Sequence, residues 1–301
     1  MRILVTGASG FLGKTLIQKL IPNKELQIYG LSRRDVDIRS DNYFHNCIDL
    51  NNLSYLKTYM SNVEPDYVFH FAANPLVKTN SSSIIQENVT TTNNILSCCR
   101  SNFVFASSAT VYGSKDITFD RTISPEPESL YAVTKLQSEE LIKFYCRTKQ
   151  IKSGLSIRYV AHVGKNSSHG VLYDLINKIN KNSKSVDILG EYPGSTKPFL
   201  LAEESMSFTI EHVFSNKLEG YDCIDIAPSD SISVSEIVDR ICLRLNIDRI
   251  KKNWLGKEST WLGDQQRLFV YSKYGCLLSS SRDAIDRAIG DICVKNTHNG
   301  C

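Results

Sequence analysis

The sequence reads Thr6-Gly7-Ala8-Ser9-Gly10-Phe11-Leu12-Gly13 near its N-terminus, and this stretch decides the fold. An apolar run, Arg2–Thr6, leads into it, and a run of helical periodicity, Phe11–Leu20, follows. Glycines in this spacing permit a tight turn, a close approach of backbone to a pyrophosphate, and close packing of helix on strand. The free N–H groups and positive dipole at the start of the helix would bind the phosphates. Strand, glycine turn and helix together predict a dinucleotide site.

The rest of the first half alternates short apolar runs with helical runs. We expect strands rich in Val, Ile, Phe and Tyr at Arg2–Thr6, Gln27–Ser32, Tyr67–Phe71, Phe103–Ser107 and Ser156–Tyr159. We expect helices between them at Phe11–Leu20, Leu53–Met60, Ile84–Cys99 and Leu130–Tyr145. Such alternation is typical of a doubly wound parallel sheet. The predicted fold class is therefore α/β, a Rossmann-type sheet with a smaller α/β substrate-binding lobe.

The composition of the sequence changes after about Gly164. Gly, Pro, Ser and Asn become more frequent, and the expected elements become shorter. Here we expect helices at Leu172–Ile179, Ser233–Leu245 and Ser281–Ile289, and strands at Val186–Leu189 and Cys223–Ile226. We interpret residues 1–165 as the nucleotide-binding domain and residues 166–293 as mainly the substrate lobe, with some segments returning to the first domain. Residues 294–301 are polar, which predicts a loose tail.

Composition narrows the class of protein. With 42% hydrophobic residues, 22% charged residues and a net charge of +3, the chain is an ordinary globular sequence without the basic excess of a nucleic-acid binder. Its nine cysteines include no Cys-x-x-Cys pair, which indicates free thiols in a reducing compartment and no metal site. The run at Met1–Val5 is too short for the apolar region of a signal sequence, so we expect none, and no apolar run has membrane-spanning length. We expect a cytoplasmic protein with neither a nucleic-acid nor a membrane partner.

The end of the second expected strand, Gly30-Leu31-Ser32-Arg33-Arg34, indicates the cofactor. An acid there would bind the ribose hydroxyls of NAD, whereas a hydroxyl beside two guanidinium groups is suited to a 2′-phosphate. NADP(H) is therefore the preferred cofactor. NAD(H) stays possible if the arginines are plain surface residues and Asp35 takes the ribose. Asp49 and Leu50 follow the third strand and are placed to touch adenine, although Asp49 also fits an acid at a helix N-terminus.

A second motif, Tyr131-Ala132-Val133-Thr134-Lys135, lies in an expected helix. Residues four apart share a helical face, so the phenol and the ammonium point to the same side. Upstream, the strand Phe103–Ser107 runs into hydroxyl residues, Ser107-Ser108-Ala109-Thr110. The carboxyl ends of parallel strands are where doubly wound sheets bind ligands. We expect the hydroxyls and the Tyr–Lys pair to form one site.

In this order, these motifs resemble the extended short-chain dehydrogenase/reductases, especially their nucleotide-sugar epimerase, dehydratase and reductase branch. His70-Phe71-Ala72-Ala73 after the fourth strand and Asn88 in the next helix add to the resemblance, which is good over residues 1–165. It implies that Tyr131 is the proton donor or acceptor at a sugar oxygen and that Ser108 hydrogen-bonds the same oxygen. Lys135 would hold the nicotinamide ribose and lower the pKa of Tyr131.

The resemblance also implies binding residues and a homodimer, paired through the helices expected at Ile84–Cys99 and Leu130–Tyr145. The implied cofactor-binding residues are Gly7, Ser9, Gly10, Phe11, Leu12, Gly13, Ser32, Arg33, Arg34, Asp49, Leu50, Phe71, Ala72, Ala73, Asn88, Tyr131 and Lys135. The implied substrate-binding residues are Val77, Ser108, Thr110, Lys197 and Arg267. Lys197 stands where the family usually has a phosphate-binding arginine, and Arg267 is a second candidate for the diphosphate.

Departures from the family pattern leave three functions open. Ala109 and Thr110 replace the acidic pair of the dehydratases, which argues against dehydration. Ala161 replaces an asparagine that grips the nucleotide sugar in many epimerases. The first hypothesis is an NADPH-dependent reductase of a 4-keto nucleotide sugar, and the second is a 4-epimerase of UDP-hexose type with a retained cofactor. The third is a non-catalytic NADP-sensing protein, against which the intact Ser108, Tyr131 and Lys135 argue.

Overall fold

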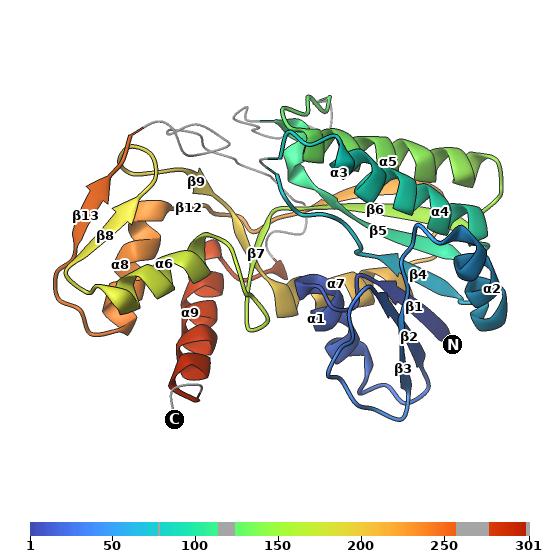
Figure 1. The fold of residues 1–301 in the computed structure, drawn as a ribbon, viewed down its shortest axis with the longest axis horizontal. Coiled ribbons are helices and arrows are strands. Elements are labelled where there is room, and N and C mark those ends of the chain that lie inside the picture. Colours follow the sequence, from blue (N-terminus) through green and yellow to red (C-terminus); the bar gives the residue numbers. More distant parts are fainter. Residues whose placement is uncertain (78, 114–123, 257–276, 299–301) are drawn as a thin grey trace. The chain divides into compact units, whose positions relative to one another are not determined.

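The computed structural model describes residues 1–77, 79–113, 124–256 and 277–298. It divides into two compact units (Figure 1). Unit 1 comprises Met1–Val111, Pro125–Tyr159 and Met206–Ile224, and unit 2 comprises Tyr112–Ser124, Val160–Ser205 and Asp225–Cys301. Among the described helices, none combines the length and apolarity needed to span a membrane.

Unit 1 is built on a seven-stranded sheet with the order β11-β6-β5-β4-β1-β2-β3. Its strands are β1 (Arg2–Thr6), β2 (Gln27–Ser32), β3 (Tyr43–Cys47), β4 (Tyr67–His70), β5 (Asn102–Ser108), β6 (Ser153–Tyr159) and β11 (Gly220–Ile226). The pairings among β1 to β6 are all parallel, which confirms the predicted doubly wound sheet. Strand order reverses between β1 and β4, so the carboxyl ends of these strands form the switch point where such sheets bind ligands.

Helices cover both faces of this sheet (Figure 1). They are α1 (Phe11–Leu20), α2 (Leu53–Val63), α3 (Ser83–Ile85), the π-helical turn η1 (Gln86–Thr90), α4 (Thr91–Cys98), α5 (Leu130–Arg147) and α7 (Ala202–Ser215). On one face, the apolar side chains of α2, α4 and α5 pack against Leu4, Val68 and Phe103 in one buried cluster. On the other face, Phe214 of α7 meets Tyr67 and Phe69 edge-on. Alternate residues of each strand thus bury on opposite faces.

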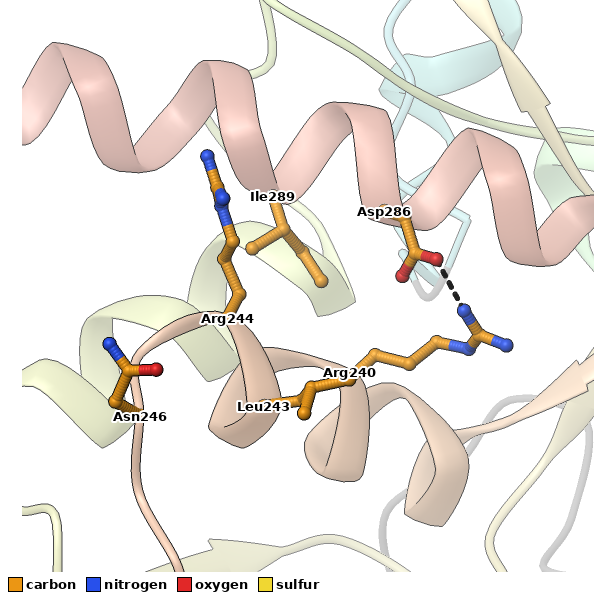
Figure 2. A pocket seen from close by; sticks show the side chains of 6 residues that line it. All are labelled: Arg240, Leu243, Arg244, Asn246, Asp286 and Ile289. Atoms are coloured by element: carbon orange, nitrogen blue, oxygen red, sulfur yellow. Dashed lines mark hydrogen bonds and ion pairs between the residues drawn. The ribbon is translucent and has the colours of Figure 1, made fainter.

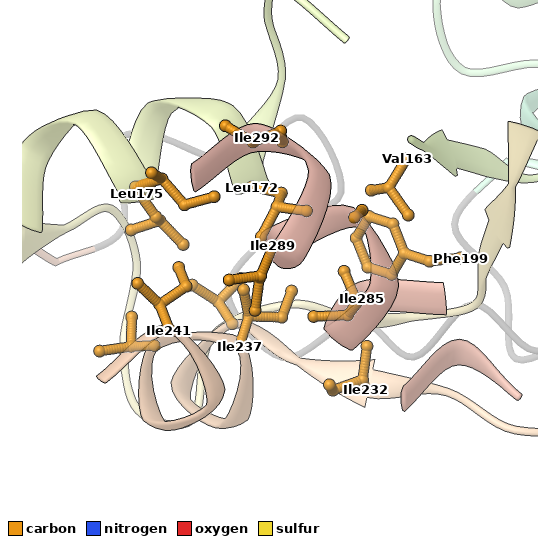
Figure 3. Close-up of a cluster of buried hydrophobic side chains, with 14 of the residues drawn as sticks. Val163, Leu172, Leu175, Phe199, Ile232, Ile237, Ile241, Ile285, Ile289 and Ile292 are labelled. Carbon is orange, nitrogen blue, oxygen red and sulfur yellow. The ribbon is translucent and has the colours of Figure 1, made fainter. Parts of the chain in front are cut away.

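The described part of unit 2 contains the helices α6 (Val171–Lys181), α8 (Val234–Arg244) and α9 (Ser281–His298), and short strand pairs. The pairs are β7 (Ala161–Val163) with β10 (Phe199–Leu201), β8 (Ser185–Ile188) with β13 (Lys251–Trp254), and β9 (Thr196–Lys197) with β12 (Ile232–Ser233). Leu172, Leu175, Ile237, Ile241, Ile285 and Ile289 of the three helices meet in one apolar cluster (Figure 3). Their three- and four-residue spacing is the helical stripe that the sequence predicts.

Some elements differ from the predictions. Strand β11 belongs to the large sheet, whereas Cys223–Ile226 is expected in the substrate lobe. Helix α9 continues to His298 and so enters the segment from Val294 that is expected to be a loose tail. The helix expected over Ile84–Cys99 is interrupted by η1, a wider turn of the kind that often marks a functional position.

Candidate active site

The glycine loop between β1 and α1 is packed too tightly for any side chain at two positions. Gly7 has a φ of +71°, and a Cβ there would lie 2.7 Å from the backbone nitrogen of Ala72. A Cβ on Gly13 would overlap the carbonyl oxygen of Gly7. The predicted roles of these glycines in turning the chain and packing the helix are therefore visible in the structure.

The start of α1 is suited to a phosphate. Its N-cap is Gly10, which offers no side-chain cap, and its first turn has no acidic residue. Ser9 and Gly10 are exposed, and Phe11 and Leu12 are half-buried. The free N–H groups and the positive end of the helix dipole would therefore meet an anion without competition from a carboxylate. This cradle fits the pyrophosphate of a dinucleotide.

The end of β2 differs in detail from the prediction. The Ser32 hydroxyl donates a 2.6 Å hydrogen bond to the carbonyl oxygen of Arg34 and lies 3.3 Å from Nε2 of His45. Ser32 is buried, whereas Arg33 and Arg34 are exposed. Ser32 therefore shapes the turn that presents the arginines, and the two guanidinium groups remain available to a phosphate.

Asp35, His45 and Cys47 lie beside this turn, with one ligand atom of each within 4.8 Å of the others. Sequence spacing does not predict this cluster, because it brings together the ends of two strands. His45 is already hydrogen-bonded at both nitrogens, from Nε2 to the Arg34 carbonyl at 3.1 Å and from Nδ1 to the Tyr43 hydroxyl at 2.9 Å. Since a carbonyl only accepts, Nε2 carries the proton and Nδ1 accepts from Tyr43. The ring in this arrangement has no lone pair to offer a metal ion.

Asp49 and Leu50 follow β3, as the sequence predicts. One carboxylate oxygen of Asp49 accepts hydrogen bonds from the backbone and side-chain nitrogens of Asn51, at 3.0 and 3.1 Å. Leu50 is buried in the apolar cluster under α2. Asp49 thus stabilises the turn into α2, and contact with adenine remains a prediction.

The hydroxyl groups at the end of β5 and the tyrosine of α5 come together. Ser129 caps α5 by accepting a 3.2 Å hydrogen bond from the backbone N–H of Ala132, and this cap fixes the first turn of the helix, which carries Tyr131. The Tyr131 side chain is hydrogen-bonded to Ser108. Thr110 donates to Oγ of the same serine, from its hydroxyl at 2.9 Å and from its N–H at 3.2 Å. Ser108, Thr110 and Tyr131 therefore form one polar cluster.

Lys135 lies one turn after Tyr131 and is only 4% exposed. Its ammonium donates a 2.7 Å hydrogen bond to the carbonyl oxygen of Ala106. Nζ lies 4.7 Å from the ring centroid of Phe105 and 5.6 Å from that of Tyr131, within cation–π range. The predicted Tyr–Lys pair is thus on one helical face, with the ammonium beside the phenol ring.

Burial is the main cause of the pKa shifts of Tyr131 and Lys135. Desolvation raises the pKa of Tyr131 to about 12, partly offset by the hydrogen bond with Ser108. Desolvation also lowers the pKa of Lys135 to about 8, partly offset by the charge of Glu139. The family resemblance implies that Lys135, together with an oxidised nicotinamide, lowers the pKa of Tyr131. In the protein alone, loss of water around the phenol raises this pKa, so the lowering stays a prediction for the complex with the cofactor.

A buried histidine, which sequence reasoning did not single out as a site residue, lies behind the pair. Nδ1 of His70 is 2.7 Å from the Thr6 hydroxyl, and Nε2 is 3.0 Å from the Thr92 hydroxyl. Thr92 donates its proton to the carbonyl of Asn88, so it accepts from Nε2, and Thr6 donates to Nδ1. Burial lowers the pKa of His70 to about 3, so the ring is neutral. It ties the carboxyl ends of β1 and β4 to α4.

Asn88 orders the segment after β4. It lies in η1 and is 2% exposed. Its Oδ1 accepts a 2.7 Å hydrogen bond from the backbone of Asn74, and its Nδ2 donates to the Thr134 hydroxyl at 3.0 Å. Phe71, Ala72 and Ala73 in this segment are half-buried, as is Val77 further along it. Asn88 therefore links that segment to α5, which carries Tyr131 and Lys135.

In unit 2, the predicted substrate residue Lys197 lies in β9. Its Nζ is 5.4 Å from the ring centroid of Phe199, and burial lowers its pKa to about 8. The other predicted diphosphate residue, Arg267, lies outside the described residues. A half-buried, readily neutralised ammonium is a chemically reasonable partner for a diphosphate.

A cavity of about 370 Å³ lies between α8 and α9 in unit 2 (Figure 2). Its lining residues are Arg240, Leu243, Arg244, Asn246, Asp286 and Ile289. Arg240 is paired with Asp286 at 2.5 Å across it. Of the predicted site residues that the structure describes, none lines this cavity, and its ion pair holds α8 to α9.

Comparison with known proteins places this geometry in a family. A sequence profile of the NAD-dependent epimerase/dehydratase family matches residues 3–200. The chain is 26% identical over 210 residues to an uncharacterised UDP-glucose epimerase, YtcB, of Bacillus subtilis (strain 168), covering 64% of this chain and 66% of that one. It is 24% identical over 264 residues to dTDP-4-dehydro-6-deoxyglucose reductase of Escherichia coli, covering 81% of this chain and 82% of that one.

Two further curated relatives are matched over about half of their length, 49% and 48%. Among solved structures, a UDP-galactose 4-epimerase is similar with a TM-score of 0.83 and 25% identity, covering 98% of this chain and 99% of that one. The profile spans more than half of the chain and includes the glycine loop, the hydroxyl cluster and the Tyr–Lys pair. The chain therefore belongs to the NAD-dependent epimerase/dehydratase family.

Proposed function

We propose that this protein is an NADP(H)-dependent oxidoreductase that reduces a 4-keto nucleotide sugar. The observation that carries the proposal is the cluster of Ser108, Tyr131 and Lys135 at the carboxyl end of β5. Tyr131 is the proton donor, Ser108 is a second hydroxyl and Lys135 is a buried cation. The first turn of α5 and the end of β5 bring the three together. Ketone reduction needs a donor at the oxygen and a fixed orientation of the carbonyl.

Each residue of the cluster has its own role in this reaction. A bound reduced nicotinamide would supply the hydride for the ketone carbon. Tyr131 gives its phenolic proton to the ketone oxygen, and Ser108 hydrogen-bonds the same oxygen and orients it. Lys135 would hold the nicotinamide ribose, and it places positive charge beside the phenol. Solvent returns a proton to Tyr131 after the alcohol leaves.

Reduction and epimerisation use Tyr131 in a different order. Reduction needs the phenol as a proton donor, whereas epimerisation first removes a proton from a sugar hydroxyl and then returns one, so it uses both forms of the phenol. The preference for the reductase therefore depends on the exposed Arg33 and Arg34, which suit NADPH as a consumed reductant. The 4-epimerase is the second candidate, favoured by the names of the Bacillus relative and of the similar solved structure. The Escherichia coli relative, matched over 81% of this chain, is named as a reductase.

The cofactor preference is a proposal that depends on the turn after β2. Gly7, Gly10 and Gly13 with the start of α1 would hold the pyrophosphate, and exposed Arg33 and Arg34 would hold the 2′-phosphate of NADP(H). Phe71, Ala72 and Ala73 would line the dinucleotide, and Asp49 and Leu50 the adenine. Lys197 of unit 2, with Arg267, would bind the diphosphate of the sugar substrate. We further propose a cytoplasmic homodimer that pairs through α4 and α5, by analogy with the family.

The decisive experiment follows the absorbance of reduced nicotinamide. Purified protein receives NADPH or NADH with a panel of 4-keto-6-deoxy nucleotide sugars on different bases. We expect NADPH to be consumed with one of them, and Tyr131→Phe to lose turnover while it still binds NADPH. If no sugar consumes cofactor but UDP-glucose and UDP-galactose interconvert, the reductase proposal is wrong and the epimerase is correct.

The cofactor preference has its own test. Replacing Arg33 by Ala removes a guanidinium that can form charge-assisted hydrogen bonds to a phosphate, worth about 1.5–3 kcal/mol each. We expect NADPH to bind at least about tenfold more weakly and NADH to bind unchanged, as measured by fluorescence titration. Equal losses for both cofactors would show that Arg33 does not contact the 2′-phosphate.

A further inference from the structure

A buried carboxylate lies directly behind the hydroxyl cluster and Lys135. Glu139, one turn after Lys135 on α5, has a side chain only 3% exposed. Arg158 of β6 binds it with both nitrogens, from Nε to Oε1 at 3.0 Å and from Nη2 to Oε2 at 2.6 Å. Ser107, the residue before Ser108, donates a short hydrogen bond to Oε1. Glu139 therefore joins α5, β5 and β6 immediately beneath the site.

Two cations interact with this carboxylate. The charge of Glu139 acts on buried Lys135, and half-buried Arg158 forms an ion pair with it. A buried cation that loses its counter-charge favours its neutral form. Arg158 cannot release its proton, so loss of Glu139 would leave Lys135 as the group that neutralises. Loss of the Glu139 charge would therefore lower the pKa of Lys135.

The other groups that face Lys135 do not supply negative charge. From its own helix it meets the ring of Tyr131, whose high pKa keeps it neutral. From β5 it meets the ring of Phe105 and the carbonyl of Ala106. From β4 it meets His70, which is neutral at physiological pH. Among the described residues, Glu139 is the carboxylate that acts on Lys135.

We propose that Glu139 is a positioning residue that keeps the ammonium of Lys135 charged beside Tyr131 and fixes the end of β5 against α5. It touches neither the cofactor nor the substrate in this role. The link to turnover depends on the function proposed above, whereas the effect on Lys135 does not. Arg158 and Ser107 hold the carboxylate in place, and Tyr221 of β11 is a further group near Glu139 and Arg158.

The test uses two adjacent substitutions on one helix. Glu139→Gln removes the buried charge but keeps the side-chain shape and the acceptor for Ser107. Glu140→Gln is the matched control, because Glu140 is exposed and pairs with Lys143 at 3.6 Å. We measure kcat/KM against pH. Activity should fall as pH rises through the pKa of Lys135, and in Glu139→Gln this fall should move to lower pH by about one to three units.

A second readout needs no substrate. In protein labelled with carbon-13 at the lysine ε-carbon, the Lys135 signal, assigned by its loss in Lys135→Met, reports the charge of that lysine against pH. We expect the same downward movement in Glu139→Gln and none in Glu140→Gln. If no sugar is turned over, the proposed function fails, but this titration still decides the role of Glu139.

Glu139→Gln leaves the half-buried Arg158 with a neutral partner, which by itself destabilises a fold. The double variant Glu139→Gln with Arg158→Met removes both charges, so it avoids this unpaired cation and provides a second test of the proposal. In the double variant we expect the pKa of Lys135 to lie between its values in the wild type and in Glu139→Gln, because the repulsion from Arg158 is gone. A Lys135 titration identical in the wild type and both Glu139 variants would overturn the proposal, as would a loss of activity without any change in the pH profile.

Discussion

Each unit contains a lysine beside a phenylalanine ring, buried Lys135 in unit 1 and half-buried Lys197 in unit 2. Nζ of Lys135 lies 4.7 Å from the centroid of Phe105, and Nζ of Lys197 lies 5.4 Å from that of Phe199. Burial lowers the pKa of each to about 8. The charge of Glu139 partly offsets this shift in Lys135, whose ammonium also donates to a backbone carbonyl.

The difference shows how one residue type can serve two tasks. The fold supplies Lys135 with a fixed acceptor and a counter-charge, which suits a group that must stay in one place through a reaction cycle. For Lys197, an arriving anion would favour the charged form, so ligand binding and protonation would be coupled. If this is correct, changes at Lys135 alter the rate of chemistry and changes at Lys197 alter substrate affinity.

The largest effect is expected from Lys135→Met, which keeps the apolar stem over Phe105 but removes the charge. We expect kcat to fall by about 10²–10⁴-fold, the usual contribution of a positioned proton-transfer group and its partner. Steady-state kinetics with the preferred substrate measure this. Lys143→Met, an exposed position on the same helix, should leave kcat unchanged. A kcat within twofold of the wild type would remove Lys135 from the mechanism.

A smaller effect is expected from Lys197→Met. A charged hydrogen bond is worth about 1.5–3 kcal/mol, so KM for the nucleotide sugar should rise by about 10- to 150-fold, with kcat changed far less. Lys181→Met on α6, an exposed position in the same unit, is the control. The opposite pattern, a lost kcat with KM preserved, would place both lysines in the same role and end the distinction.

The smallest effect concerns pH. Because the pKa of Lys197 is lowered to about 8, its ammonium is charged below pH 8 and neutral above it. Substrate affinity should therefore be constant below pH 8 and fall by up to about tenfold per pH unit above it. Calorimetry of nucleotide-sugar binding from pH 7 to 9 measures this, and Lys197→Met should abolish the dependence. A pH dependence that persists in the variant must come from another group.

Local patterns in the sequence predict the first part of the fold to the residue. The bounds of β1, α1 and β2 agree with the expected runs, because the glycine turn fixes where strand ends and helix begins. Strand β3 has no such signal. It is a short edge strand, Tyr43–Cys47, with only its first residue buried. Helix α7 begins at Ala202 directly after β10, with no Gly, Pro or capping residue to mark the change.

Long-range pairing is what the sequence leaves undetermined. Nothing within Gly220–Ile226 indicates that β11 joins the sheet of unit 1, because its partner β6 is distant in sequence. The site follows the same rule. The Tyr131–Lys135 pair is predicted by its spacing. Glu139, one turn after Lys135, is expected from its position to be a salt-bridge residue, and the structure pairs it with Arg158. The hydrogen bond between His70 and Thr6, and that from Ser32 to the Arg34 carbonyl, cannot be predicted from the sequence because they depend on how the strands pair.

The tight packing of the glycine loop limits how this protein could be redesigned. A Cβ on Gly7 or Gly13 would collide with backbone, which cannot move aside as a flexible side chain can. Exposed Arg33 and Arg34 face no such obstacle. Laboratory evolution toward another nicotinamide cofactor should therefore accept changes in the turn after β2 and reject them in the loop after β1. The two turns lie at the ends of neighbouring strands, yet one can accept substitutions and the other cannot.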